Sequence, residues 1–196
     1  LQTMGAYSEA HPLFERALAI SEKAFGRKHL NTAEPLNNLA NLLRIQGAYS
    51  EARPLLERSL AIKEKALGPE HPSLGLSLNN LATLFQSMGS YSKARLLYER
   101  ALMIKEKELG PGDPSLATSL NNLGVVLYKE GFYAEARPLY ERALAIRENV
   151  LGLEHPEVAK SLNNLALLLE STDFYLEARP LFERSLAIKK KTLGPT

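Results

Sequence analysis

The sequence predicts an all-α protein of the α-solenoid class, in which antiparallel helix pairs stack side by side. Two observations support this prediction: one unit recurs every 42 residues, and each unit carries two stretches of helical apolar periodicity. The period is visible in tyrosines and glycines that return at a constant spacing. These markers are Tyr7, Tyr49, Tyr91, Tyr133 and Tyr175, and Gly26, Gly68, Gly110, Gly152 and Gly194. Because the units overlay without insertion, we expect residues 1–196 to form a single repeat array.

The first helix of a unit is predicted from leucines that recur at three- and four-residue steps. In the second complete unit this pattern runs from about Pro72 to Met88 and gives one apolar stripe along the helix. Gly89 follows, and glycine readily adopts the left-handed conformation that ends a helix. We therefore expect the chain to turn back at this glycine.

The second helix of the same unit is predicted from about Tyr91 to Leu109. Lys105 and Lys107 stand in its last turns, where a positive charge complements the negative end of the helix. Gly110 marks its end. Two helices of this length have apolar faces wide enough for two neighbours, so each unit must stack on another.

This register gives about nine helices. A lone helix of the second type is expected at about residues 7–25, and only the segment LQTMG remains of its partner helix. Four complete repeats are expected at about residues 30–68, 72–110, 114–152 and 156–194. The chain begins in the middle of the pattern, which favours a piece of a longer protein.

The overall composition argues against several classes of function. Lysine and arginine number 24 and aspartate and glutamate 22, a formal net charge of +2 that is too balanced for general nucleic-acid binding. A helical-repeat RNA reader would also need base-reading residues and a basic groove, and neither is evident. No apolar run approaches the ~20 residues of a membrane span. The absence of cysteine permits a reducing compartment. We therefore expect no nucleic-acid or membrane partner, and a cytoplasmic location.

Three histidines share one repeat position, which raises the alternatives of a metal site or a set of general bases. They are His29, His71 and His155, and Asp113 takes the fourth copy. The next residue is proline in three of the four copies, and a short polar side chain before proline is typical of a helix N-cap. Equivalent residues of successive units lie too far apart to share one ion. We expect helix capping or turn packing at this position, and neither a metal nor a cofactor.

No set of residues predicts an enzyme. A nucleophilic site would need a serine held against a histidine and a carboxylate, but every candidate residue belongs to the repeat. Adjacent glutamate and arginine residues are expected to form local ion pairs on exposed helix faces rather than an active site. These residues are Glu57 and Arg58, Glu99 and Arg100, Glu141 and Arg142, and Glu183 and Arg184. We expect no catalytic residues.

An asparagine pair recurs in the first helix of every unit, in LNNLA at residues 36–40, 78–82 and 162–166 and in LNNLG at 120–124. Asparagine is a poor helix former, so its recurrence needs a separate reason. At about 100° per residue, the pair falls on the polar side of the helix, opposite the leucines. In one interpretation, an asparagine of each pair bonds to the adjacent unit. In the other, the amides line a binding surface and bracket the peptide groups of an extended segment.

The repeat resembles the tetratricopeptide repeat, in the 42-residue variety found in kinesin light chains and related bacterial proteins. The resemblance covers the whole chain and rests on small and aromatic residues at fixed spacing. In one unit they are Ala82, Phe85, Gly89, Tyr91, Ala94, Tyr98 and Ala101. The segments LNNLA, ERALAI and LGPEHP are especially similar to the light-chain type, whereas Asp173 replaces the glycine once. The resemblance implies a right-handed superhelix whose first helices line a concave groove that binds a protein or peptide.

The resemblance also implies which side chains contact the partner, because light-chain-like repeats direct this asparagine toward a cargo peptide. We expect the second asparagine of each pair to hold the backbone, and the variable neighbours on the same face to select the sequence. The predicted peptide-binding residues are Asn38, Asn80, Asn122, Asn164, Asn41, Arg44, Gln86, Tyr128, Lys129 and Lys160. The two lysines favour an acidic peptide, whereas Glu34 and Glu170 weaken that expectation.

The alternative function is structural, as a spacer or a self-assembling array. The first and last helices have apolar sides with no polar cap, so molecules would associate end to end. This possible self-association competes with peptide binding as the main role.

Overall fold

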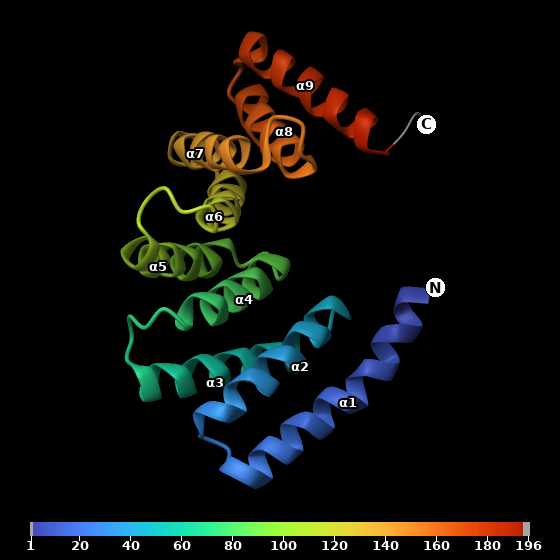
Figure 1. Cartoon of the computed structure of the whole chain (residues 1–196), viewed down its shortest axis with the longest axis vertical. Helices are drawn as coiled ribbons and strands as arrows, with labels where there is room; N and C mark the ends of the chain where they lie inside the picture. Colours follow the sequence, from blue (N-terminus) through green and yellow to red (C-terminus); the bar gives the residue numbers. More distant parts are fainter. Residues whose placement is uncertain (1, 194–196) are drawn as a thin grey trace. The chain divides into compact units, whose positions relative to one another are not determined.

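The computed structural model describes residues 2–193, with side chains described for residues 9–192. Within that range the protein consists of nine α-helices and one short 3-10 helix, η1, with no strand (Figure 1). The predicted all-α class is therefore confirmed. The elements are α1 (Gln2–Phe25), η1 (Leu30–Thr32), α2 (Ala33–Ile45), α3 (Tyr49–Leu67), α4 (Leu74–Ser87), α5 (Tyr91–Leu109), α6 (Leu116–Glu130), α7 (Tyr133–Leu151), α8 (Pro156–Ser171) and α9 (Tyr175–Leu193).

Bounds were predicted for three helices, and two of them, α4 and α5, agree within two residues. α5 has its predicted limits, whereas α4 begins at Leu74 because residues 71–73 form a turn closed by a 2.9 Å hydrogen bond from Leu74 N to the carbonyl oxygen of His71. The larger difference is α1, which begins at Gln2 rather than at about Tyr7. Residues 2–5 of the segment LQTMG therefore belong to α1 and not to a separate partner helix. Gly5, the counterpart of Gly47, lies inside α1, where a single glycine is tolerated at a cost of about 1 kcal/mol relative to alanine.

The turn glycines adopt the conformation that the sequence requires of them. Gly47 and Gly89, which separate the two helices of a pair, have φ of 81° and 72°. Asp173 occupies the same position before α9 and also has a positive φ of 65°. Aspartate tolerates this region better than most residues, and its carboxylate accepts a 2.8 Å hydrogen bond from the Tyr175 hydroxyl. The replacement of glycine by aspartate therefore preserves the turn.

The helices form two compact units, Leu1–Ile104 and Lys105–Thr196, and each unit has its own core. In the first unit, helices α1 to α4 lie beside one another in chain order (Figure 1). Its core includes Ala33 and Leu36 of α2 packed against Ile62 of α3 and Leu18 of α1. A first helix is thus buried between the second helix of its own repeat and that of the preceding one.

The second unit repeats this arrangement. Val158 and Leu162 of α8 pack against Ile188 of α9 and Leu144 of α7. Both Val158 and Leu162 are completely buried. The apolar stripe predicted for first helices therefore faces two neighbouring second helices, which is the reason that a single helix pair cannot close a core.

The predicted role of the histidine position in helix capping or turn packing is confirmed. The Nδ1 atoms of His29, His71 and His155 accept hydrogen bonds of 3.1 to 3.2 Å from the backbone N–H two residues further on. Asp113 accepts a 2.8 Å bond from Ser115 N, and hydrogen bonds from Ser115 lower the pKa of its carboxyl group. Only His155 directly caps an α-helix, because the other three precede a further turn or η1.

Arginines of the second helices connect successive repeats. In the first unit, Arg100 donates to the Glu64 carboxylate at 2.5 Å and to the carbonyl oxygen of Pro69 at 2.6 Å. The equivalent Arg58 donates to Glu22 at 2.6 Å and to the carbonyl oxygen of Arg27 at 2.5 Å. In the second unit, the same contacts join Arg142 to Glu106 and Pro111, and Arg184 to Glu148 and Leu153. One guanidinium thus holds both the preceding second helix and the turn that follows it.

This arrangement corrects the expectation of purely local pairs between adjacent glutamate and arginine residues. Glu57 pairs with Arg53, four residues earlier, at 2.7 Å, and the equivalent pairs recur in α5, α7 and α9. Arg58 instead turns toward the preceding repeat. The physical reason is that neighbouring residues on a helix point about 100° apart and therefore face different partners.

Replacement of Arg100 by alanine should lower the free energy of unfolding by about 1 kcal/mol, because Glu64 and the Pro69 carbonyl lose their shared donor. The matched control is Arg179→Ala, which removes the exposed pair with Glu183 within α9 and should cost less than about 0.5 kcal/mol. Urea unfolding of both variants measures the difference. Equal losses would show that the link between repeats contributes no more than a local surface pair.

Candidate functional site

The asparagine pairs lie where the first helices of neighbouring repeats approach each other. In the first unit, Asn80 of α4 donates through Nδ2 to Oδ1 of Asn37 in α2 at 3.0 Å. In the second unit, Asn164 of α8 donates to Asn121 of α6 in the same way at 2.8 Å. The second asparagine of one repeat is therefore bonded to the first asparagine of the preceding repeat. One asparagine of each pair thus takes part in stacking, the first in α2 and α6 and the second in α4 and α8.

This bond uses only part of the hydrogen-bonding capacity of each amide. An asparagine side chain has two N–H donors and a carbonyl oxygen with two lone pairs, so Asn80 and Asn164 each keep a carbonyl oxygen and one N–H. Asn38 is exposed and Asn122 half-buried, and neither side chain makes a hydrogen bond within the described residues. Stacking and ligand contact are thus compatible on the same face.

A cavity of about 720 Å³ in the first unit lies beside these amides. Asn37 and Asn38 contribute its polar wall, together with Glu34. Lys63 of α3 reaches the same cavity and donates to the Ser77 hydroxyl at 2.9 Å. Burial lowers the pKa of the Lys63 ammonium, while the nearby Glu34 charge acts in the opposite direction. The remaining lining residues are Leu30, Asn31, Leu67, His71, Ser73 and Leu76.

A second cavity, of about 340 Å³, occupies the equivalent face of the second unit. Three cations line it, Arg147, Lys160 and Lys189, against the single carboxylate of Glu157. The other lining residues are Thr118, Asn121, Asn122, Asn163 and Asn164. This cavity combines an amide-rich wall with an excess of positive charge.

The positive charges of the second cavity are held in different ways. Arg147 is only 6% exposed; it donates to the Ser161 hydroxyl at 2.6 Å and lies 3.3 Å from Glu157. Glu157 also accepts a 2.5 Å bond from Lys160, and this bond is the main reason that the pKa of its carboxyl group is lowered. Glu157 thus remains ionised at neutral pH and neutralises part of the charge of its two partners. Lys189 has no carboxylate partner within the described residues.

The structure places four of the predicted binding residues in these cavities. Asn38 lines the first, and Asn122, Asn164 and Lys160 line the second. Asn80 lies at the contact between α2 and α4 through its bond to Asn37. Predicted amides therefore line a cavity in each unit, and one of the two predicted lysines lines the cavity of the second unit.

The other predicted residues lie on the same helices outside the cavities. Gln86 accepts a 3.0 Å bond from the hydroxyl of Tyr98, a buried side chain of α5. Tyr128 bonds to the Ser171 hydroxyl at 2.8 Å, and the Lys129 ammonium lies 5.8 Å from the centre of its ring. Two further predicted residues, Asn41 and Arg44 of α2, are half-buried and line neither cavity.

Sequence reasoning missed the basic residues that the second helices supply to this face. Lys63, Arg147 and Lys189 occupy one repeat position, as does Lys105. The signal is present in the sequence as a basic residue at this position of all four complete repeats. Because the predicted groove consists of first helices alone, the prediction assigns these residues no role in binding.

No helix in the described part of the chain is long and apolar enough to cross a membrane.

The helix pairs, the arginine links and the amide contacts together define a helical-repeat protein. Sequence models of the tetratricopeptide repeat match residues 1–65, 36–107 and 115–194, and a related model of the same repeat matches residues 79–150. The chain belongs to the tetratricopeptide repeat family. Repeats of this family generally mediate protein–protein interaction.

Several solved structures are similar to this chain. Nearly identical TPR-like repeats of kinesin light chain type from Podosopora anserina are 33% identical, with a TM-score of 0.81 over 97% of this chain and 90% of that one. BtubC (BKLC) from P. vanneervenii is 25% identical, with a TM-score of 0.86 over 100% of this chain and 78% of that one. MamA, at 16% identity and a TM-score of 0.69 over 98% of this chain and 94% of that one, shares the fold. No curated protein sequence matches the chain.

These similarities confirm the resemblance to kinesin-light-chain-like repeats. The family and the solved neighbours are repeat scaffolds rather than catalytic folds.

Replacement of Asn80 by alanine should destabilise the fold by about 1 kcal/mol relative to replacement of Asn38, because only the first change leaves the buried Asn37 Oδ1 without its donor. Alanine is the better helix former at both positions, so the difference between the variants isolates the hydrogen bond. Urea unfolding of the two variants provides the measurement. Identical unfolding midpoints would remove the amide bond from the forces that join the repeats.

Proposed function

We propose that the face formed by the first helices binds an extended segment of a partner protein. The observation that carries this proposal is the coincidence, in each unit, of a cavity with asparagine amides that have unused donors and acceptors. An extended peptide presents N–H and C=O groups at regular intervals, and amides repeated along the array suit such a backbone. We also propose that residues 1–196 form a single repeat array.

The residues that surround the amides differ from one repeat to the next, and they would determine which partner sequence is bound. The excess of cations in the second cavity favours an acidic side chain, because the unpaired Lys189 is available to it. The first cavity combines Glu34 and Lys63 with Leu76, which is 62% exposed, and suits an apolar side chain better. We therefore expect the second unit to prefer a partner segment with an acidic side chain, and the first unit a segment with an apolar side chain.

The remaining predicted residues keep a role at the margins of this surface. Asn41, Arg44 and Gln86 extend the polar side of the first unit, and Tyr128 and Lys129 that of the second. Arg44 is half-buried, and its Nε atom is covered by the protein and has no hydrogen-bond partner in the described structure. A ligand would therefore meet the accessible part of this side chain and not the Nε atom.

A binding role, rather than catalysis, is part of the proposal. The titratable groups of the second cavity are bound to one another in a fixed arrangement, Arg147 with Glu157 and Glu157 with Lys160. Neither a nucleophile nor a general base stands apart from the repeat pattern. We also propose a protein rather than a nucleic-acid or membrane partner, and a cytoplasmic setting, on the balanced charge and the cysteine-free composition.

Replacement of Lys189 by glutamate should weaken binding of an acidic peptide, selected on the wild-type chain from a library of extended segments, by about tenfold. The matched control is Lys190→Glu, the same charge change on the adjacent residue, which lines neither cavity. Isothermal titration calorimetry gives both affinities. Equal weakening by the two variants would indicate a general charge effect and exclude the cavity as the binding site.

Self-assembly remains the second candidate, and exposed apolar side chains on the last helix favour it. Leu176 is 93% exposed, and Tyr175 and Leu186 are more than half exposed. If the apolar side chains of α9 pack against a second copy of the chain, the molecular mass measured by light scattering should rise with protein concentration. The variant Leu176→Asp should abolish this rise. A constant monomer mass over a hundredfold concentration range would remove this candidate.

A further inference from the structure

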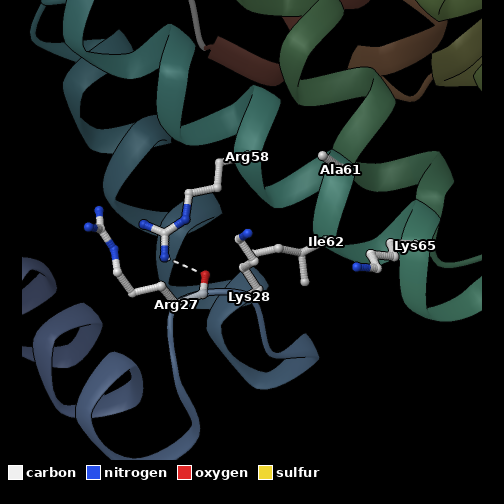
Figure 2. A pocket seen from close by; sticks show the side chains of 6 residues that line it. All are labelled: Arg27, Lys28, Arg58, Ala61, Ile62 and Lys65. Carbon is white, nitrogen blue, oxygen red and sulfur yellow. Dashed lines mark hydrogen bonds between the residues drawn. The ribbon is translucent and has the colours of Figure 1, made fainter.

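A third cavity lies away from the asparagine face, between the turn that follows α1 and the outer side of α3. Its volume is about 460 Å³. The lining residues are Arg27, Lys28, Arg58, Ala61, Ile62 and Lys65 (Figure 2). Four of these six side chains are cationic, and the other two are apolar. The cavity belongs entirely to the first unit.

Part of this positive charge is already balanced within the protein. Arg58 donates to the Glu22 carboxylate and to the carbonyl oxygen of Arg27, the contact drawn as a dashed line in Figure 2. The Arg27 guanidinium lies 3.7 Å from the same Glu22 carboxylate. Lys28 and Lys65 have no carboxylate partner among the described residues. One carboxylate therefore serves two arginines, and the two lysines remain uncompensated.

The last repeat shows what the same backbone arrangement does when the charges are opposite. Its residues at the positions of Lys28 and Lys65 are Glu154 and Lys191, and these two side chains form an ion pair. The surrounding contacts are also equivalent, because Arg184 holds Glu148 and the carbonyl oxygen of Leu153 as Arg58 holds Glu22 and that of Arg27. These two positions are thus close enough to pair directly. In the first repeat they carry two lysines instead.

The two intermediate repeats do not carry like charges at these positions. The sequence has Glu70 with Lys107 in one and Gly112 with Asn149 in the other. The later repeats also lack a charge at the position of Arg27, where they have Pro69, Pro111 and Leu153. The cluster of Arg27, Lys28 and Lys65 is therefore a property of the first repeat, and the stacking of repeats does not require it.

Like charges at neighbouring positions destabilise a fold by a few tenths of a kcal/mol per pair unless an anion lies between them. We propose that this cavity binds a doubly charged oxyanion of the phosphate monoester type, between the turn after α1 and the side chains of α3. A single carboxylate would balance only one of the two uncompensated lysines, whereas a phosphate balances both. The guanidinium of Arg27 adds a planar donor set that suits phosphate oxygens. Ala61 and Ile62 offer an apolar floor for the carbon atoms that carry the phosphate.

The test uses the full chain and three probes: inorganic phosphate, a short blocked peptide with one phosphoserine, and the same peptide without phosphate. Heteronuclear NMR follows the amide signals of residues 26–30 and 61–65 during each titration. We expect saturable shifts there with both phosphate-containing probes. Lys28→Glu, which recreates the ion pair of the last repeat, should weaken that binding by about tenfold or more. Its thermal stability should equal or exceed that of the wild type, because one repulsion becomes an attraction.

The control is Lys190→Glu, which makes the same change of net charge far along the sequence and should keep the affinity of the wild type. Equal affinity for phosphate and phosphopeptide would identify the oxyanion itself as the ligand. A phosphopeptide that binds at least tenfold more tightly would identify a phosphorylated segment of a partner. The proposal is overturned if Lys28→Glu binds as tightly as the wild type, if the unphosphorylated peptide binds equally well, or if no probe shifts these signals at millimolar concentration.

Discussion

The structure depends on one constraint: a first helix can bury its apolar stripe only between two second helices, one from its own repeat and one from the repeat before it. Leu36 and Val158, one in each unit, are completely buried in this position. Polar contacts then add directional constraints on the spacing between successive repeats, which apolar packing alone does not provide. The arginines of the second helices bind both the preceding helix and its following turn, and the asparagines of the first helices bond to each other.

The same stacking produces the candidate binding surface. Because Asn37 and Asn80 are bonded to each other across two repeats, their own amides hold one orientation before any ligand arrives, and less conformational entropy is lost on binding. The second helices complete the surface by extending Lys63 and Arg147 past the stacking contact to serines of the next first helix. A structural contact and a candidate recognition group therefore share one face, and neither excludes the other.

The strict period also makes charge differences between repeats informative. Arg58 and Arg184 make equivalent contacts, so the backbone around them provides one geometry with two sets of neighbouring side chains. In the last repeat, Glu154 and Lys191 occupy these positions and form an ion pair. In the first repeat, Lys28 and Lys65 occupy them and line a cavity. Departures from the repeat consensus thus separate residues that hold the array together from residues that are free to bind something else.

The sequence by itself determined the period, the limits of α5, the turn glycines and the polar turn or cap position of His29, His71, Asp113 and His155, because these features depend on contacts a few residues apart. It also placed Asn38 and Asn122 on the polar side of their helices, since helical periodicity fixes the face on which a side chain lies. Only the tertiary structure decided which partner each side chain meets across repeats: that Arg58 turns to the preceding helix, that Asn80 bonds to Asn37, and that Arg147 and Lys189 reach the cavity. The physical reason is that these contacts depend on the rotation and lateral distance of neighbouring helices, which packing sets and no local pattern records.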